Sequence, residues 1–227
     1  MLPSPVVEDR DGLLVVRDDL LPGGTKRRVL DGLLNCADEF VYASPACGYA
    51  QVALAYAATA NGKRATIFTA RRNAPHARTA EARAAGAKIV MVPFGYLSNV
   101  TARARLYAAQ TGAAYLPFGF DTAEVAEALV AVAAGLGVMP REVWTVAGSG
   151  TLSRALQRAW PAAAFYAVRI GKAPDIGRAA LRVAPEPFER DARERPPFPS
   201  CGNYDAKAWR FIVRQASPGA LFWNVAA

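Results

Sequence analysis

The residues Val143-Trp144-Thr145-Val146-Ala147-Gly148-Ser149-Gly150-Thr151-Leu152 combine a short apolar run, a glycine-containing turn and the start of a helix-forming segment. Free N–H groups at a helix N-terminus, approached closely across glycine, form a cradle for a phosphate group. The P-loop pattern is absent, and Ser153 stands where a dinucleotide fingerprint has its third glycine. Two interpretations of Gly148, Ser149, Gly150 and Thr151 therefore remain: a site for one phosphate monoester, or an ordinary turn between strand and helix.

Around this stretch, short apolar runs alternate with alanine-rich segments, which is typical of an α/β protein with mainly parallel sheets. The runs are apolar enough that we expect helices on both faces of the sheets. A proline- and charge-rich stretch, 171–203, breaks the rhythm and is predicted to be an irregular surface excursion. We predict strands at 39–43, 65–69, 88–93, 143–146, 164–169 and 220–224, and helices at 51–60, 77–85, 100–110, 122–134, 152–160 and 205–215.

The composition excludes several classes of protein. The chain has 227 residues, 52% of them hydrophobic and 20% charged, which indicates a packed globular protein. No apolar run approaches the ~20 residues of a membrane helix, and the N-terminus does not resemble a signal sequence, so we expect a cytoplasmic protein. Three widely spaced cysteines and a single histidine, His76, favour neither a disulfide framework nor a metal site. No Gly-x-Ser-x-Gly elbow accompanies His76, so a catalytic triad is not expected.

The net charge of +8 has two interpretations. An arginine-rich, solvated surface explains it without any partner. Alternatively, the chain binds a polyanion such as DNA, because distributed lysines and arginines gain affinity by releasing counterions. Charge alone does not decide between them.

A second glycine-containing segment, Gly23-Gly24-Thr25-Lys26, places a lysine at the start of a helix-prone run. A lysine that forms a Schiff base must be held in place and often has a lowered pKa, to which the neighbouring Arg27 and Arg28 could contribute. The alternative is a basic turn before a surface helix.

The order of these segments resembles that of the tryptophan-synthase-β-like family, the fold-type II enzymes that use pyridoxal 5'-phosphate (PLP). The resemblance is greatest to the branch of 1-aminocyclopropane-1-carboxylate deaminase and D-cysteine desulfhydrase, although this chain is shorter. It implies a two-lobed, three-layer α/β/α fold, with a large cofactor-binding lobe at 1–43 and 112–227, a small lobe at 44–111, and a homodimer. The segments that carry the resemblance, besides the two quoted above, are 47–56, 62–68, 81–90, 204–208 and 220–224.

The same resemblance implies roles for individual residues. Lys26 would form the Schiff base with PLP and later move the Cα proton, while Gly148, Ser149, Gly150 and Thr151 would bind the phosphate. A carboxylate at Asp205, near the pyridine nitrogen, would keep that nitrogen protonated. The remaining residues implied are Cys47, Gly48 and Tyr49, which would face the cofactor ring, Tyr204, which would stand beside the substrate, and Asn224, a further cofactor contact on the last strand.

Two departures from the family pattern concern this site. Tyr49 replaces an asparagine that contacts the ring, and the last strand continues as Val225-Ala226-Ala227 where the family has Thr-Gly-Gly. A shortened chain with a basic surface could admit a substrate larger than a free amino acid.

Three functions follow from these observations. The first is a PLP-dependent lyase, such as a deaminase or eliminase, that cleaves a bond at Cα or Cβ of an amino acid. The second is a PLP-dependent decarboxylase acting on an amino acid attached to a DNA base, as in the hypermodification of thymidine in bacteriophage DNA. The third is a non-catalytic relative that binds PLP or another phosphate ligand.

Overall fold

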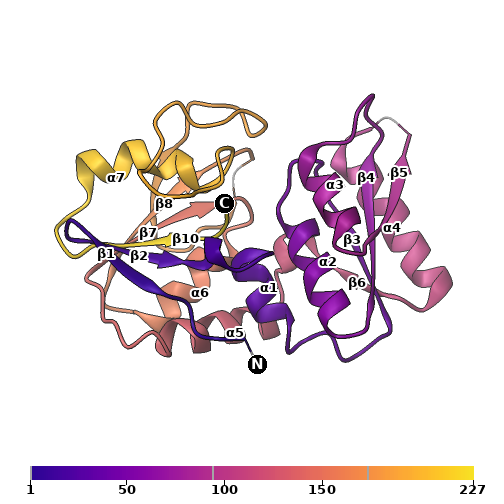
Figure 1. Cartoon of the computed structure of the whole chain (residues 1–227), viewed down its shortest axis with the longest axis horizontal. Coiled ribbons are helices and arrows are strands. Elements are labelled where there is room, and N and C mark those ends of the chain that lie inside the picture. Colours follow the sequence, from indigo (N-terminus) through magenta and orange to yellow (C-terminus); the bar gives the residue numbers. More distant parts are fainter. Residues whose placement is uncertain (1, 94, 173) are drawn as a thin grey trace. The chain divides into compact units, whose positions relative to one another are not determined.

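The computed structural model describes residues 2–93, 95–172 and 174–227, and it contains two compact α/β units (Figure 1). Unit 1 comprises Leu2 and Pro22–Thr122, and unit 2 comprises Pro3–Leu21 and Ala123–Ala227. Each unit has a largely parallel sheet between helices, so the predicted fold class is confirmed. None of the helices described has both the length and the hydropathy that a bilayer span requires.

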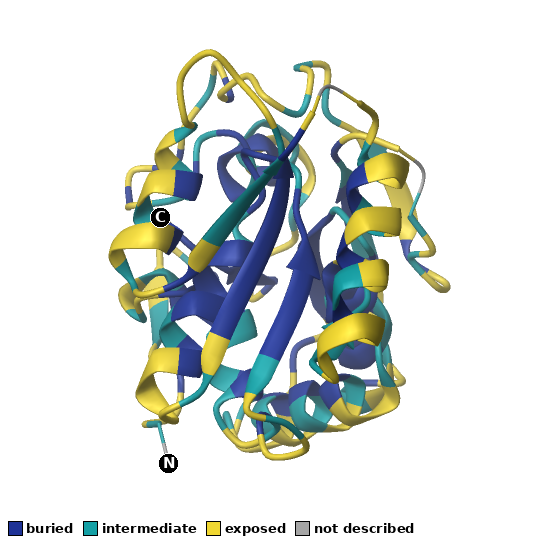
Figure 2. Ribbon diagram, turned by 90° about the vertical axis from the view of Figure 1, so that its right-hand side faces the viewer, coloured by how far each residue is buried: buried dark blue, intermediate teal, exposed yellow. Residues whose placement is uncertain are grey.

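Unit 1 is built on a four-stranded parallel sheet with the order β5-β4-β3-β6. Helix α4 packs on one face through Val100 and Ala104, which contact Val41 and Phe68 of the sheet. Helix α2, which contacts β4, packs against both α1 and α3 on the other face (Figure 1), and Figure 2 shows helices on both sides of the buried strands. The elements are α1 (Gly24–Leu30), β3 (Glu39–Ala43), α2 (Ala50–Ala60), β4 (Arg64–Ala70), α3 (Ala77–Ala84), β5 (Lys88–Val92), α4 (Leu97–Thr111), β6 (Ala114–Leu116) and the 3-10 turn η2 (Phe118–Phe120).

Unit 2 is built on a six-stranded sheet with the order β1-β2-β10-β7-β8-β9, in which only the β1–β2 pair is antiparallel. Helices α5 and α6 pack together on one face, whereas η3 and α7 cover the other. The elements are β1 (Val7–Arg10), β2 (Leu13–Arg17), η1 (Asp18–Leu20), α5 (Ala123–Ala134), β7 (Glu142–Ala147), α6 (Thr151–Ala159), β8 (Ala164–Arg169), β9 (Ala180–Val183), η3 (Asp205–Ala208), α7 (Trp209–Gln215) and β10 (Leu221–Asn224).

The boundaries of the units differ from the predicted lobes, 1–43 with 112–227 and 44–111. Residues 22–43 and 112–122 belong to unit 1, because β3 pairs in parallel with β4 and β6, and α1 packs on α2. The apolar run of β3 does not reveal to which of two parallel sheets it belongs. The boundaries of the two units therefore differ from the predicted lobes at β3, and the division into lobes stays a prediction.

The stretch 171–203 is less irregular than predicted. Strand β9 lies within it and extends the sheet by pairing with β8. The remainder is anchored by Lys207, which is 1% exposed and whose Nζ lies 2.9 Å from the carbonyl oxygen of Pro187. The carbonyls of Glu186 and Phe188 also accept from this ammonium group. A buried cation that has hydrogen-bond acceptors on several sides thus holds a segment with little secondary structure of its own.

Candidate active site

The predicted phosphate loop lies in unit 2 where β7 ends and α6 begins. Strand β7 is buried along its whole length, and Gly150 forms the N-cap of α6 with φ of 86°. A Cβ atom on Gly150 would come 1.8 Å from the backbone oxygen of Asp175. Glycine is therefore required here both by the left-handed backbone and by the close approach of a second segment. The loop thus joins strand to helix through a glycine turn, as the sequence predicted, and its binding of a phosphate stays a prediction.

The loop also carries two neighbouring hydroxyl groups. Ser149 Oγ and Thr151 Oγ1 lie 3.0 Å apart, and Thr151 is buried. Arg154, one turn into α6, donates from Nη1 to the backbone oxygen of Asp175, and the two side chains form an ion pair of 3.6 Å. Arg154 adds a positive charge beside the loop, and the sequence motif did not mark it.

Tyr204 is joined directly to the loop. Its hydroxyl accepts from the Gly148 N–H at 3.2 Å and lies 3.3 Å from the carbonyl oxygen of Val146, to which it can donate. The prediction that Tyr204 stands beside the substrate is not tested by these contacts. They show instead that the tyrosine hydroxyl fixes the backbone where the loop leaves β7.

Asp205, the next residue, is completely buried. Its Oδ2 accepts from the Ala226 N–H at 3.1 Å, whereas its Oδ1 has no hydrogen-bond partner among the described residues. Burial raises the pKa of this carboxyl well above its usual range, although the N–H groups of Ala226 and Val225 act in the opposite direction. A buried carboxyl oxygen without a hydrogen bond lowers the stability of the fold unless a further donor binds to it.

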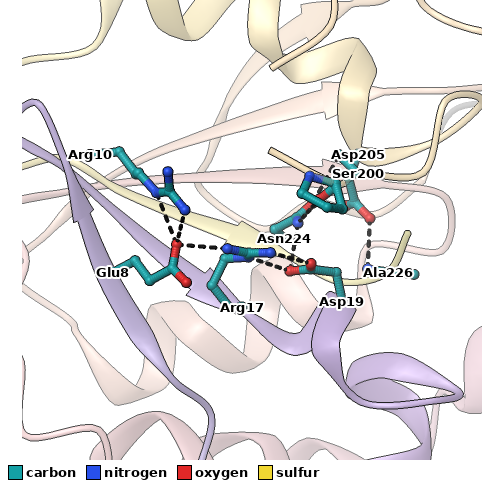
Figure 3. Close-up of polar contacts among 9 residues, drawn as sticks. Glu8, Arg10, Arg17, Asp19, Ser200, Asp205, Asn224 and Ala226 are labelled. Carbon is teal, nitrogen blue, oxygen red and sulfur yellow. Dashed lines mark hydrogen bonds and ion pairs between the residues drawn. The ribbon is translucent and has the colours of Figure 1, made fainter. Parts of the chain in front are cut away.

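Asn224, predicted to contact the cofactor, is engaged within the protein. Its Nδ2 donates to Asp19 Oδ1 and to the carbonyl oxygen of Pro199, both at 2.8 Å, and its Oδ1 accepts from Ser200 Oγ at 2.8 Å (Figure 3). Both amide hydrogens are thereby used. Asn224 joins β10 to η1 and to the end of the excursion, and it has no donor left for a ligand.

In unit 1, Lys26 lies in the first turn of α1 and is half-buried. Its Nζ donates to the carbonyl oxygen of Gly119 at 2.5 Å and lies 5.2 Å from the centre of the Phe120 ring. Desolvation lowers the pKa of Lys26 to about 8, although the negative charge of Asp121 raises it. The predicted lysine is thus held by a single carbonyl on an aromatic surface, where its amine form is accessible near neutral pH.

The carbonyl that holds Lys26 belongs to a backbone turn that the sequence did not single out. Gly119 and Phe120 both have positive φ, 74° and 55°, the second being unusual for a bulky side chain. Phe120 is completely buried and packs against Tyr42 with ring centres 4.8 Å apart. The Tyr42 hydroxyl also accepts from the Gly119 N–H at 3.4 Å. These contacts keep the turn in a conformation that costs about 1–3 kcal/mol.

In unit 1, the residues predicted to face the cofactor ring, Cys47, Gly48 and Tyr49, lie in the loop that precedes α2. Gln51 is buried, and its Nε2 donates to the carbonyl oxygens of Ala46 and Gly48 at 2.8 and 3.0 Å, which closes the loop on itself. Cys47 is buried as a free thiol. The ring of Tyr49 is covered by the Arg78 guanidinium, 4.6 Å from the ring centre.

The structure therefore places the predicted residues in two groups. Lys26 and the 47–51 loop belong to unit 1, while the phosphate loop, Tyr204, Asp205 and Asn224 belong to unit 2. In the described ranges, no three His, Cys, Asp or Glu side chains are arranged to hold a metal ion. His76 caps α3 by accepting from the Arg78 N–H, a structural role.

Several solved structures share this fold. An ACC deaminase homologue superposes with a TM-score of 0.84 at 14% identity, covering 99% of this chain and 90% of that one. O-ureido-L-serine synthase superposes with a TM-score of 0.74 at 17% sequence identity, covering 98% of this chain and 88% of that one. Escherichia coli diaminopropionate ammonia lyase superposes with a TM-score of 0.65 at 14% identity, covering 95% of this chain and 77% of that one. No family model and no curated protein matches the chain.

These likenesses define the class of protein by its fold. The chain has the tryptophan-synthase-β-like fold of the fold-type II PLP enzymes, as its motifs predicted. At sequence identities of 14–17%, the similarity shows the fold, whereas the chemistry depends on the residues of this chain.

We predict that Gly150→Ala disrupts the phosphate loop, because the new methyl group collides with the Asp175 backbone. Gly137→Ala is the matched control: its φ is 68° in the same unit, but nothing lies within 4 Å of the new Cβ. The control should lose about 1 kcal/mol of unfolding free energy from backbone strain, and Gly150→Ala more than ~3 kcal/mol. Chemical denaturation measures both, and equal losses would contradict the assigned packing.

We predict that Lys26 is acylated by trace acetic anhydride with a pH midpoint near 8. Only the amine form reacts, so the rate rises as pH increases through the pKa. Asp121→Asn should move the midpoint to lower pH, because the charge that favours the ammonium form is removed. Asp38→Asn, which removes a charge paired with Lys63, is the control and should leave the midpoint in place. Peptide mass mapping measures the labelling of Lys26.

Proposed function

We propose that the chain is a PLP-dependent enzyme that cleaves a bond at Cα or Cβ of an amino-acid substrate. The observation that carries this proposal is the environment of Lys26, a desolvated lysine with a lowered pKa and one main-chain acceptor. A lysine that must capture an aldehyde needs this combination of fixed position and available amine. The fold shared with lyases and deaminases supports the same conclusion.

The residues of the chain fit the cofactor. In unit 2, the Gly148–Thr151 loop offers N–H and hydroxyl groups to a phosphate monoester, with Arg154 beside it. The unpartnered Oδ1 of Asp205 fits the protonated nitrogen of a pyridine ring. In unit 1, Lys26 supplies the amine. Each of these groups has the chemistry that one part of PLP requires.

Each of these residues would then have a defined task in the reaction. PLP, when bound, supplies an electron sink for the pair released at Cα. Lys26 would hold the cofactor and afterwards carry the Cα proton at Nζ, as its pKa of about 8 allows. Asp205 would hold the proton of the ring nitrogen in place. The N–H groups at the start of α2, ordered by Gln51, would orient the substrate carboxylate.

We predict that reduction of the PLP-loaded protein with borohydride attaches the cofactor covalently to Lys26. Peptide mass mapping should find the added mass there, and Lys26→Ala should lose both this adduct and the visible absorption of bound PLP. Arg28→Ala removes a nearby cation of the same helix and is the control. Labelling of another lysine would refute the assignment, whereas bound PLP without turnover of any amino acid would favour the non-catalytic relative.

A second candidate function is the decarboxylation of an amino acid attached to a DNA base. One observation favours a polyanionic substrate, namely the uneven distribution of charge. Unit 1 contains twelve basic and five acidic residues, whereas unit 2 contains fifteen and fourteen. At the amino end of the unit 1 sheet, Lys63 and Arg64 are paired with Asp38 and Glu39. Arg71 and Arg103, near the carboxyl ends of β4 and β5, form no ion pair with any described residue.

If this function is correct, unit 1 binds duplex DNA with an affinity that falls steeply with salt concentration. Arg71→Ser and Arg103→Ser should each weaken binding several-fold and reduce the salt slope by about one. Arg141→Ser removes an exposed arginine of unit 2 and should have no effect. Fluorescence anisotropy of a labelled duplex measures all four proteins. Absence of binding at low salt would remove this candidate and leave the free amino acid as substrate.

A further inference from the structure

Arg17 and Asp19 form a buried ion pair at the end of β2. Arg17 Nε donates to Asp19 Oδ1 and its Nη2 to Asp19 Oδ2, both at 2.8 Å, and the side chains are 5% and 1% exposed. Asn224 Nδ2 donates to the same Oδ1 at 2.8 Å. Both oxygens of Asp19 are therefore occupied from within the protein, and its charge is compensated by one guanidinium.

The pair continues outward to the surface (Figure 3). Arg17 Nη1 lies 2.6 Å from Glu8 Oε2, and Arg10, 43% exposed, pairs with the same oxygen of Glu8 at 2.5 Å. The charges alternate from Arg10 through Glu8 and Arg17 to Asp19. Arg17 is the cation of this series that contacts the carboxylate of Asp19, which also accepts from Asn224.

Asp205 differs from Asp19 in that one of its oxygens is not engaged. Its Oδ1 lacks a partner among the described residues, although the whole side chain is buried. Burial is the main cause that raises its pKa, and the negative charges of Asp19 and Asp18 act in the same direction. Asp19 accepts from Asn224 of β10, and Asp205 accepts from the N–H of Ala226 two residues further on, so both carboxylates are held at the same end of this strand. The ionisation of Asp205 therefore depends in part on how completely the charge of Asp19 is cancelled.

The other ionisable groups on the elements around Asp205 have their own partners. They include Asp18, which accepts from Trp223 Nε1; Cys201, whose thiol donates to Asn203 Oδ1; Tyr204, bound to Gly148 and Val146; Lys207, directed at the carbonyls of 186–188; Glu142, bound to Trp144 and Ser217; and Arg210, paired with Glu186 and Glu194. Arg17, by contrast, is a cation bound to Asp19, a carboxylate that acts on Asp205.

We propose that Arg17 is a positioning residue for the ring nitrogen of the cofactor: by binding both oxygens of Asp19 it cancels the charge that disfavours ionisation of Asp205, and so prepares the Asp205 carboxylate to hold a protonated pyridine. The role of Asp205 rests on the proposed function. The electrostatic dependence of Asp205 on Arg17 does not, and it can be measured without the cofactor.

The experiment follows the titration of Asp205 in cofactor-free protein labelled with carbon-13 at the aspartate carboxyl carbons. The resonance is assigned by its loss in Asp205→Asn. Arg17→Met should move the midpoint of Asp205 to higher pH by about one unit or more, because Asp19 is left uncompensated. Asp19→Asn should move it to lower pH, and the double variant should return it close to the wild-type value. Arg10→Met, at the exposed end of the series, is the control and should leave it unchanged.

The double variant separates electrostatics from structure. If Arg17 only supports the fold, the additional removal of Asp19 will not restore the titration midpoint of Asp205. A double variant whose midpoint is as high as that of Arg17→Met would therefore overturn the proposal. Should Arg17→Met fail to fold, as judged by circular dichroism, Asp19→Asn and the double variant decide alone. In that case, the proposed role of Arg17 would be refuted if the midpoint of Asp205 in Asp19→Asn were not lower than its midpoint in the double variant.

The affinity for PLP, measured by fluorescence quenching, supplies the connection to function. Arg17→Met should bind PLP about tenfold more weakly than the wild type, with recovery in the double variant. If the wild type binds no PLP while the titration behaves as expected, the proposed function fails and the dependence of Asp205 on Arg17 stands. If PLP binds and the titration midpoints do not move, the proposed function stands and the role of Arg17 fails.

Discussion

The insertion of the last strand between two earlier ones is the constraint on which unit 2 depends. β10 pairs in parallel with β2 on one side and with β7 on the other, so the two ends of the chain complete a single sheet. This pairing sets Asn224 opposite Arg17 and brings Trp223 within 3.2 Å of Asp18. It also directs the N–H of Ala226 at Asp205. The same strand therefore positions Asp205, the acidic residues Asp18 and Asp19, and the neighbouring strand β7, which leads into the Gly148–Thr151 loop.

Buried ionisable groups of the chain fall into two kinds. Arg17 and Lys207 are almost inaccessible to water, and each has several acceptors that compensate for its desolvation. Lys26 and Asp205 have few partners: one carbonyl accepts from the first, and one oxygen of the second is unengaged. Burial lowers the pKa of Lys26 and raises that of Asp205, so in both cases the neutral form is favoured. Incomplete compensation of this kind is typical of groups that act on a ligand.

Much of the secondary structure could be predicted from the sequence, because the apolar runs of buried strands and the alanine-rich segments of helices can be recognised from neighbouring residues alone. Strands β3 and β8 lie at the predicted residues, and helix α2 begins one residue earlier than expected. Strands β1, β2, β6 and β9 were not predicted, and residues 205–208, predicted as the start of a helix, form a 3-10 turn. β9 has no apolar periodicity, because it is a largely exposed strand at the edge of the sheet that pairs with β8 on one side. Its formation depends on a neighbour that is distant in the sequence.

The sequence by itself determined the fold class, the glycine-containing turn at Gly148–Thr151 and the presence of a lysine after two glycines, because each depends on residues that are close together in the chain. Only the tertiary structure decided what surrounds them. The strained turn at Gly119 and Phe120 that receives Lys26, the use of Asn224 inside the protein, and the Arg17–Asp19 pair near Asp205 all join residues far apart in sequence. Hydrogen bonding and desolvation act through space, so no local pattern encodes the pKa of a buried group or the partner it lacks.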